Sequence, residues 1–552
     1  MSSDTKPTTA AGGGAEPAEE PGEVLIVGAG PTGLMAACEL LRRGVGVRLI
    51  DRAPAPSPFP KALLLWPRSL DLLEDLGALD AAHEAGLLIN AFDYYSAGRP
   101  LATFDFPPAL APLCLPQSET ERVLTGALHA LGGTIERGVR LLAFDGLDYS
   151  GRIAEGGSVT SILEHSGDGR VERARHRFVI GADGAGSAVR AQLGTAFTGA
   201  TYETAFALVD AHIEGELPPD RALYYQSPAG ALVVVALPKG VYRFFTSLPP
   251  GQQVSVPLLQ RVVDEQGPRG VRLVDPVWEA VFRVHRRHAT DFQLGRVFLA
   301  GDAAHVHSPA GGQGLNTGLQ DAHNLAWKIA AVLREEAPGE LLASYEPERK
   351  AVARRVVRET DIQTRGWMLK HPLQVAARDA AFRLLDRSGV MARHYVPVMA
   401  GRRLAYPQAR ETQEPADRTG CRLSRGRLPG GGLRIGGVFP REGASETAPG
   451  WTLVATARGD ETWRGALEEA VAGWPQVRVT ETPGARGWAC ARPSYHLVRP
   501  DGHLAAHGHD GDLDRLREEL RATLGAAAPA AVTSGATTTA DSGQPSKWNQ
   551  TP

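Results

Sequence analysis

The sequence is poor in cysteine: it has four in 552 residues, and no two of them form a CxxC pair. This scarcity argues against a disulfide scaffold and a zinc site, so we expect no metal centre and a reducing cytoplasmic environment. No hydrophobic run approaches the ~20 residues that a transmembrane helix requires. The N-terminus also lacks the hydrophobic stretch of a secretion signal. We therefore expect a soluble cytoplasmic protein with no membrane partner.

An excess of charge of either sign is missing as well. The chain carries 62 acidic and 59 basic residues, which gives a net charge of −3 at pH 7. This balance gives no electrostatic reason to expect a nucleic-acid partner. Hydrophobic residues make up 43% and charged residues 22%, which is typical of a globular protein. The length is sufficient for two or three domains.

Both ends of the chain lack the hydrophobic residues that a core needs, and we expect them to be disordered tails. Between them, hydrophobic runs followed by glycine turns predict a nucleotide-binding domain in two segments. The stretch between those segments is rich in strand-like runs and predicts an inserted antiparallel sheet that binds substrate. The expected regions are a tail at 1–22, a nucleotide-binding domain at 23–190 and 285–400, a substrate sheet at 191–284, a small α/β domain at 401–525 and a tail at 526–552.

A GxGxxG motif directly follows the first hydrophobic run, residues 24–27. In a strand-turn-helix unit the first glycine permits the tight turn, the second lets a pyrophosphate approach the backbone, and the third lets helix and strand pack closely. An acid at the end of the second strand then binds the ribose. Glycine is abundant here, so chance is the alternative, but strand, turn, helix, strand and acid occur in order. The predicted contacts are Gly28, Gly30, Pro31, Thr32, Gly33, Asp51 and Arg52.

Two later glycine turns each follow a hydrophobic run. One is Gly181-Ala182-Asp183-Gly184 within residues 177–190, and the other is Gly301-Asp302 within residues 301–318. These stretches resemble the DG and GD motifs of the group A flavoprotein monooxygenases, the para-hydroxybenzoate hydroxylase type. The resemblance runs from residue 23 to about residue 350. It implies a Rossmann-like FAD-binding domain with an inserted antiparallel sheet, FAD as cofactor and NADPH or NADH as co-substrate.

The resemblance also implies roles for individual residues. Asp302 holds the ribityl chain of FAD, and Pro309 lies near the reactive face of the flavin. The backbone of Gly314, Leu315 and Asn316 faces the pyrimidine edge, where a helix N-terminus stabilises negative charge by about 0.3–1 kcal/mol. Asp183 supports the FAD-binding region in the same way. Taken singly, an aspartate beside a glycine is more often a simple turn residue, but the ordered motifs favour the cofactor role.

Further FAD contacts follow from Leu115-Pro116-Gln117 and Glu121-Arg122, which resemble the family in the same way and imply Gln117 and Arg122 as contacts. One position departs from the family pattern. Lys61 stands where an arginine is usual, and lysine keeps the charge but loses the bidentate fork. Either FAD is held less rigidly here, or Arg68 or Arg52 compensates.

His305 and His307 form no metal site in this interpretation, because no third ligand is evident and the flavin motif surrounds them. A structural or pocket-lining role is expected instead.

The C-terminal region resembles the thioredoxin-like domain of phenol hydroxylases and aromatic polyketide hydroxylases, most clearly over residues 498–505. Without a CxxC pair, redox activity is not expected. The expected role is packing or oligomerisation, for example as a homodimer.

The function implied is hydroxylation of an aromatic or polycyclic, polyketide-type substrate by O₂ through a flavin C4a-hydroperoxide, as in antibiotic biosynthesis. Because the cofactor carries the chemistry, no catalytic residues are assigned. Candidate substrate contacts on the inserted sheet are Tyr224, Tyr225, Gln226 and Phe245, with core packing as the alternative. Baeyer–Villiger oxidation on the same fold is the nearest rival, and a non-enzymatic FAD-fold protein is a distant one. A flavin halogenase is disfavoured because no Trp-x-Trp-x-Ile motif occurs.

Overall fold

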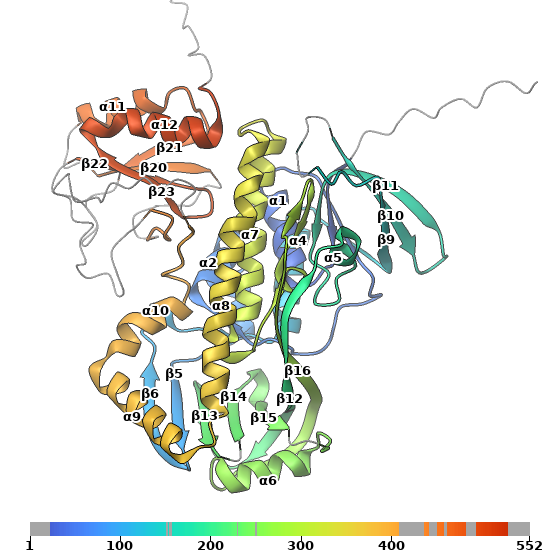
Figure 1. Cartoon of the computed structure of the whole chain (residues 1–552), viewed down its shortest axis with the longest axis vertical. Coiled ribbons are helices and arrows are strands. Elements are labelled where there is room, and N and C mark those ends of the chain that lie inside the picture. The colour runs from blue at the N-terminus through green and yellow to red at the C-terminus, as the bar shows by residue number, and fades with distance from the viewer. Residues whose placement is uncertain are drawn as a thin grey trace, which may run out of the picture.

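The structure is a computed structural model that describes residues 22–150, 153, 157–228, 230–248, 251–407, 435–440, 450–456, 461–481 and 493–527. The tails expected at 1–22 and 526–552 lie almost wholly outside these residues. Two long helices, α7 (Gln313–Leu333) and α8 (Tyr345–Trp367), run through the centre of the molecule (Figure 1). An antiparallel sheet lies at one end of them and a small α/β domain at the other. Within the described residues, no helix has the length and hydrophobicity to cross a bilayer.

A mostly parallel sheet forms the nucleotide-binding part. Its main path runs β17-β18-β11-β1-β2-β8, with β9 and β10 attached through β11. β1 begins at Gly22, one residue earlier than expected, and its central residues are fully buried because both neighbours are parallel strands. The strands are β1 (Gly22–Val27), β2 (Val47–Asp51), β8 (Ile135–Arg137), β9 (Val139–Asp145), β10 (Val159–His165), β11 (Val171–Gly181), β17 (Gln293–Leu294) and β18 (Val297–Leu299).

Three helices pack on this sheet through one hydrophobic core. α1 (Pro31–Leu41) contacts both α4 (Gln117–Ala130) and α7. Shorter elements complete this part: α2 (Pro67–Asp75), α3 (Leu79–Ala85), α5 (Ala188–Leu193), and a three-stranded sheet of β3 (Leu64–Leu65), β4 (Leu87–Leu88) and β7 (Leu113–Cys114).

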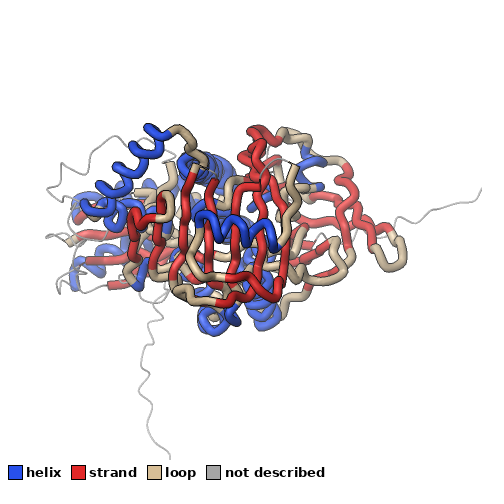
Figure 2. The backbone as a smooth tube through the Cα atoms, turned by 90° about the horizontal axis from the view of Figure 1, so that it is seen from below, coloured by secondary structure: helices blue, strands red, loops and turns tan. Residues whose placement is uncertain are grey.

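The second sheet has eight strands in the order β19-β16-β12-β15-β14-β13-β5-β6. Figure 2 shows α6 (Val256–Gln266) lying across one face of it. The strands are β5 (Ala91–Ser96), β6 (Arg99–Asp105), β12 (Phe197–Glu214), β13 (Arg221–Ser227), β14 (Gly230–Ala236), β15 (Tyr242–Leu248), β16 (Arg272–Ala289) and β19 (His305–Val306).

Three strands of this sheet, β5, β6 and β19, come from outside the expected segment 191–284. Both β5 and β6 lie within residues 23–190, the segment expected to belong to the nucleotide-binding domain, yet β5 pairs in parallel with β13 and β6 pairs with β5. The pairing is reinforced by ring stacking, since Tyr94 stacks on Tyr224 and Tyr95 on Tyr225. Such a contact between distant segments leaves no local signal in the sequence.

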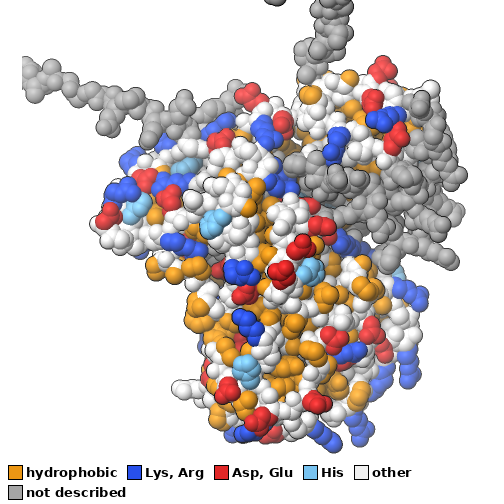
Figure 3. Space-filling model, turned by 180° about the vertical axis from the view of Figure 1, so that it is seen from behind, with side chains coloured by type: hydrophobic (Ala, Val, Ile, Leu, Met, Phe, Trp, Pro, Cys, Tyr) orange, Lys and Arg blue, Asp and Glu red, His pale blue; other side chains and the backbone are white. Residues whose placement is uncertain are grey.

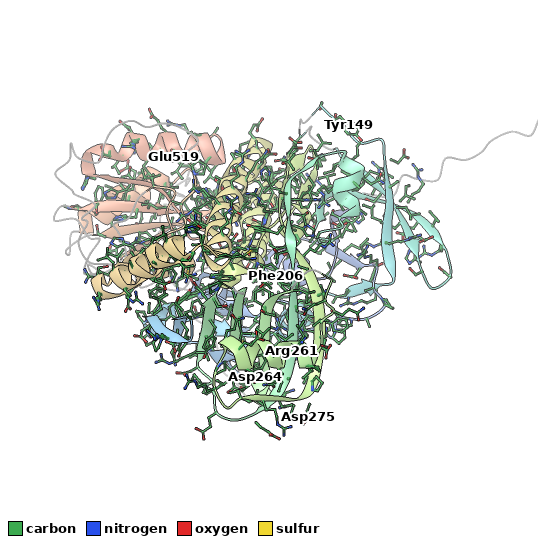
Figure 4. The ribbon with its side chains drawn as sticks, turned by 60° about the horizontal axis from the view of Figure 1, so that its bottom comes forward. Tyr149, Phe206, Arg261, Asp264, Asp275 and Glu519 are labelled. Atoms are coloured by element: carbon green, nitrogen blue, oxygen red, sulfur yellow. The ribbon has the colours of Figure 1, made fainter. Side chains whose placement is uncertain are left out.

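The opposite face of this sheet is covered by the C-terminal half of α8 together with α9 (Pro372–Ser388) and α10 (Val396–Met399). On this face Tyr224 contacts Trp367 of α8, and Tyr94 contacts Phe382 of α9. This face therefore looks toward the nucleotide-binding part, whereas α6 covers the outer face. Figure 4 shows the same arrangement, with Phe206 at the centre and Arg261 and Asp264 of α6 on the outer side.

The C-terminal part is a small α/β domain with the strand order β21-β20-β22-β23. Its hydrophobic core continues into α7, because Trp327 and Ala331 pack with Trp451 and its neighbours. Its elements are β20 (Trp451–Thr456), α11 (Glu461–Val471), β21 (Val477–Glu481), β22 (Ser494–Val498), β23 (Leu504–His509) and α12 (Leu513–Leu524).

The surface carries interspersed charges of both signs. On the face drawn in Figure 3, acidic and basic side chains alternate, and hydrophobic side chains show between them over the lower half of the molecule.

Candidate functional site

The GxGxxG turn between β1 and α1 has two glycines that packing requires and one that faces open space. A Cβ on Gly28, at φ +104°, would lie 2.5 Å from the Ala182 carbonyl oxygen, and one on Gly33 would lie 1.8 Å from the Gly28 oxygen. A Cβ on Gly30 would meet no atom within 4 Å. The loop therefore leaves room for a ligand beside Gly30, at the start of the helix.

Two helices begin at this place without a side-chain cap. α1 starts at Pro31 with Gly30 as its N-cap, and α7 starts at Gln313 with Gly312 as its N-cap. Thr32 brings the two segments together, because a Cβ on either Gly301 or Gly318 would lie 2.5 Å from its Oγ1. Uncapped N-termini carry free N–H groups and a partial positive charge, so both can bind anionic groups.

Asp51, at the end of β2, is bound to the glycine loop itself. Its Oδ2 accepts a hydrogen bond from Ala29 N at 2.7 Å, and its Oδ1 accepts one from Ala53 N at 2.8 Å. The carboxylate thus fixes the shape of the loop, and each oxygen keeps a lone pair for a ribose hydroxyl. Arg52 is exposed.

Asp302 faces open solvent but is surrounded by protein on its other sides. Desolvation by these surroundings raises the pKa of its carboxyl, while His305 and Lys61 act in the opposite direction. Lys61, although exposed, is therefore close enough to influence the predicted ribityl-binding carboxylate.

Gln117 and Arg122, the two predicted contacts on α4, differ in their surroundings. Gln117 donates from Nε2 to Glu121 Oε1 at 2.9 Å and accepts from Ala62 N at 3.3 Å, beside Lys61. Arg122 is exposed and pairs with Glu119 at 2.7 Å. Of the two, only Gln117 is held among the other predicted FAD contacts.

Glu121 lies in the motif Glu121-Arg122, which predicts an FAD contact for Arg122 and none for Glu121. It is 7% exposed, and burial raises its pKa, partly offset by Gln117 and Lys61. The sequence does show that Glu121 follows Gln117 by four residues. Because residues i and i+4 share a helix face, this spacing predicts that Glu121 lies beside Gln117.

Asp183 of the DG motif acts on the backbone around it. Its carboxylate accepts hydrogen bonds from Ala188 N at 2.6 Å and Val189 N at 3.2 Å, and from the Ser187 hydroxyl, at the start of α5. Arg190, at the end of the motif, donates to the Ala303 carbonyl at 2.8 Å. The DG motif therefore contacts the GD loop through Arg190, and the role of Asp183 in FAD binding stays a prediction.

Asp321 of α7 holds the GD loop from within. It is fully buried and accepts hydrogen bonds from Gly301 N at 3.0 Å, His305 Nε2 at 2.6 Å and Arg349 Nε at 2.6 Å. Burial alone would raise the pKa of this carboxyl, but Arg349 and His305 lower it below the usual value. His305 is thus a structural residue. Neither Asp321 nor Arg349 lies within the motifs that predict FAD contacts.

His307 has a buried Nε2 without a hydrogen-bond partner, while its Nδ1 contacts the Ser308 carbonyl at 2.9 Å. Desolvation lowers its pKa to about 4, so the ring is neutral at pH 7. It lies beside the start of α7, where a Cβ on Gly314 would be 3.6 Å from its ring. No cluster of three or more metal-binding side chains occurs among the described residues.

Asn316 uses its side chain for structure. Oδ1 accepts from Trp66 N at 2.8 Å, and Nδ2 donates to the Leu64 carbonyl at 2.7 Å. Asn316, Leu315 and Gly314 lie in the first turn of α7, and Pro309 is exposed at the loop before it.

Aromatic rings line the inward face of the second sheet. Phe206, Phe245 and Phe282 stack in sequence on three neighbouring strands, with ring centroids 5.0 and 5.4 Å apart. Tyr224 also lies on this face. These rings form a hydrophobic surface that looks toward the nucleotide-binding part.

The other two substrate candidates lie on opposite faces of β13. Tyr225 points to the outer face and packs in the cluster under α6. Gln226 is 2% exposed and follows Tyr224 by two residues, so it shares the inward face.

Arg68 takes no part in this site. Its guanidinium donates to the Asp501 carbonyl of the C-terminal domain and lies 3.5 Å from Asp71. Arg68 therefore does not compensate for the missing fork at Lys61.

The two cysteines within the described residues are unreactive. Cys38 and Cys114 are free and buried, and burial raises the pKa of each to about 12. Cys421 and Cys490 lie outside the described residues.

These features fit FAD. The open space at Gly30 and the uncapped start of α1 suit a pyrophosphate, Asp302 suits a polyol chain, and the uncapped start of α7 suits the electron-rich edge of a flavin. The unpartnered His307 Nε2 lies beside that last position.

Comparison with known proteins agrees with this geometry. Residues 22–360 match the family described as "FAD binding domain". The chain is 33% identical over 537 residues to 6-methylpretetramide 4-monooxygenase of Streptomyces rimosus, covering 91% of this chain and 93% of that protein. Its structure is similar to OxyS anhydrotetracycline hydroxylase from Streptomyces rimosus, with a TM-score of 0.71, 28% identity, and coverage of 92% of this chain and 99% of that one. It is also similar to aklavinone-11 hydroxylase in a ternary complex with FAD and aklavinone, with a TM-score of 0.71, 26% identity, and coverage of 91% and 99%.

Proposed function

The chain belongs to the FAD-binding class A aromatic hydroxylase family, and from that premise we propose that it hydroxylates an aromatic polyketide with O₂ and NAD(P)H. One observation carries the proposal. The N-termini of α1 and α7, both without a side-chain cap, lie together, and the second sheet has aromatic side chains on its inward face. The first feature suits FAD and the second suits a flat, fused-ring substrate.

When bound, FAD supplies the activation of O₂ with electrons from NAD(P)H. The residues of this chain bind and orient it. The start of α7 presents N–H groups and a positive dipole end, which stabilise a negatively charged flavin edge by about 0.3–1 kcal/mol. Asp321, held by Arg349 and His305, fixes the loop from which Asp302 and Pro309 face the site.

The protein also keeps the region between α8 and the sheet dry. Trp367 of α8, Tyr224 of β13 and Phe206 of β12 are each at most 7% exposed. A site closed by such rings protects reactive oxygen chemistry from water, which is the main demand that this reaction makes on the protein. Because these side chains supply no obvious acid or base, we assign no catalytic residue to them.

The polyketide substrate class rests on the relatives and on the shape of the inward face. The proteins compared above carry 6-methylpretetramide, anhydrotetracycline or aklavinone in their names. In this chain, the phenylalanines of β12, β15 and β16 stack on one another and give the inward face an aromatic, apolar surface suited to an aromatic ligand. A reaction in the cytoplasm is consistent with the low cysteine content of the sequence.

We also propose that the C-terminal domain is thioredoxin-like in topology and without redox activity. Its strand order β21-β20-β22-β23, with β20 and β21 parallel and β22 and β23 antiparallel, supports the first part. The absence of a CxxC pair from the sequence supports the second. Its contacts with α7 and α8 indicate a packing role, and self-association as a homodimer stays a prediction for light scattering.

The test is turnover with purified holoprotein. The protein should be yellow, NAD(P)H should reduce it anaerobically, and admission of air with a panel of aromatic polyketides should give a product one oxygen heavier with its rings intact. A lactone product would indicate Baeyer–Villiger oxidation instead. A colourless protein that cannot be reconstituted with FAD would contradict the proposal.

A further inference from the structure

Gln226 is a buried amide with no partner among the described residues. Its side chain is 2% exposed, and both Oε1 and Nε2 are buried without a hydrogen-bond partner. Buried polar groups in native proteins nearly always have partners, and each exception requires an explanation. Burying an amide whose oxygen and nitrogen both lack partners costs folding free energy. A ligand that pairs with both atoms therefore gains more binding free energy than it would from a solvent-exposed amide.

The position of Gln226 on the sheet places it among the aromatic side chains proposed to contact substrate. Side chains alternate along β13, so Gln226 shares a face with Tyr224, which contacts Trp367 of α8. Tyr225 and Ser227 point the other way, toward α6, where Tyr225 packs in the cluster under that helix. Gln226 therefore lies on the face of the sheet that α8 and α9 cover, opposite α6.

The inward face beside Gln226 carries small side chains. On the neighbouring strand β14 it offers Ala231 and Val233 between Gln226 and Phe245 of β15. Two strand spacings separate β13 from β15, roughly 9–10 Å, which is the width of a fused-ring system. Phe245 belongs to the stack of phenylalanines that continues to β16.

The polar side chain next to Gln226 on the other side is already engaged. Ser96, which pairs with Gln226 across β5 and β13, accepts a hydrogen bond from Arg378 Nη2 at 3.2 Å. Arg378 in turn bonds to Asp379 and to the Gly366 carbonyl. These neighbouring polar groups all have hydrogen-bond partners, whereas the donor and the acceptor of Gln226 have none.

We propose that Gln226 determines substrate specificity by recognising a paired donor and acceptor on one edge of a polycyclic aromatic ligand. Oε1 accepts from the donor and Nε2 donates to the acceptor, as in a carboxamide or a hydroxyl beside a carbonyl. The inference rests on the proposed function and adds the polar part of the substrate to the aromatic part. Gln226 is a binding residue and takes no part in oxygen transfer.

The experiment compares two fluorescent probes on the FAD-loaded enzyme without turnover. Anthracene-2-carboxamide carries the donor–acceptor edge, and 2-isopropylanthracene has a similar shape without it. Gln226→Leu should weaken binding of the carboxamide on the order of tenfold or more and leave the isopropyl probe within about twofold. Because the variant removes an unpaired buried amide, its melting temperature without ligand should be unchanged or higher.

Tyr225→Phe is the matched control, since it alters the adjacent side chain on the outer face, and both probes should bind it as they bind the wild type. The inference is overturned if the wild type does not prefer the carboxamide, if Gln226→Leu weakens both probes equally, or if that variant melts at a lower temperature. Failure of the proposed function is a separate result, namely no oxygenated product from wild-type enzyme with any aromatic polyketide.

Discussion

Each end of α8 lies near a buried polar side chain, and the two differ in whether protein groups pair with them. Near its start, Glu348 is bound by Arg499 at 2.6 and 2.9 Å and by Lys328 at 2.8 Å. Near its end, Trp367 packs against β13, the strand that carries the unpartnered Gln226. Both regions are buried, but only in the first do protein groups pair with the buried polar side chain.

The paired network joins the C-terminal domain to the FAD-binding part. Arg499 binds Asp501 at 2.6 Å as well as Glu348, and it lies 5.2 Å over the ring of Tyr406. Tyr406 receives a hydrogen bond from Arg349 at 3.1 Å, and Arg349 binds the aspartate of α7 that holds the GD loop. A chain of contacts thus runs from the C-terminal domain to the proposed flavin site.

Buried polar groups that have protein partners and those that lack them should respond differently to mutation. Where a buried charge has protein partners, removing one of them should cost stability. Where buried polar atoms or helix N-termini lack partners, a substitution there should leave the stability of the protein nearly unchanged. It should instead weaken the binding of a ligand. Four changes test that distinction, beginning with the largest expected effect.

Arg499→Met should destabilise the protein by about 3–5 kcal/mol, because it leaves Glu348 and Asp501 buried with too few positive partners. Thermal unfolding should show the loss, and limited proteolysis should show the C-terminal domain released first. Arg464→Met is the control. It breaks a pair with Glu468 in which both side chains are 51% exposed, so the melting temperature should be nearly unchanged. Equal effects would contradict the account.

Acid should weaken the same network. Burial alone would raise the pKa of Glu348, but Arg499 and Lys328 lower it to about 2 from a usual value of 4.5. Between pH 2 and pH 4.5 this carboxyl is therefore protonated in the unfolded chain but ionised in the folded protein. Its contribution to folding stability is complete above pH 4.5 and is lost as the pH falls toward 2. The expected size is about 3 kcal/mol. Glu348→Gln should flatten this part of the stability–pH curve; an unchanged curve would contradict the assignment.

Gly30→Ala tests the open side of the comparison. A methyl group there meets no protein atom, so the melting temperature of the apoprotein should stay within about 2 °C. The methyl occupies space proposed for the pyrophosphate, and FAD should bind roughly tenfold more weakly in a fluorescence titration. Gly33→Ala is the contrast, since its methyl would lie 1.8 Å from the Gly28 oxygen and should impair folding. Unaltered FAD affinity in Gly30→Ala would place the pyrophosphate elsewhere.

Lys61→Arg should have the smallest effect. Arginine restores the bidentate fork at an exposed position near Asp302 and Glu121, so FAD should be retained a few-fold more tightly at unchanged stability. Dissociation of FAD on dilution measures this directly. Unchanged retention would show that Lys61 does not contact the cofactor, and weaker retention would show that an arginine fork does not fit there.

The sequence predicts the parts of the fold that depend on neighbouring residues. Glycine placement after hydrophobic runs indicates the turn after β1 and the turn before α7. The family motifs extend this to FAD and to hydroxylation. Within one motif, however, the sequence does not separate Gln117, which lies beside Lys61, from Arg122, which lies on the solvent face of α4 beside Glu119.

The rest depends on contacts between distant segments. Asp321 and Arg349 look like ordinary helix residues in the sequence, and only the packing of α7 against α8 makes them the support of the GD loop. The strands β5 and β6 join the second sheet through pairing across more than a hundred residues of chain. Arg68 looks available for FAD in the sequence, but the C-terminal domain binds it in the structure.

The central claim is that this chain transfers an oxygen atom from O₂ to an aromatic polyketide. The most direct measurement is the mass of the product formed by the FAD-loaded enzyme and NAD(P)H under ¹⁸O₂, with ordinary water as solvent. We expect one ¹⁸O atom in a product whose rings are intact. Oxygen derived from water, or hydrogen peroxide as the sole product with every aromatic polyketide tested, would contradict it.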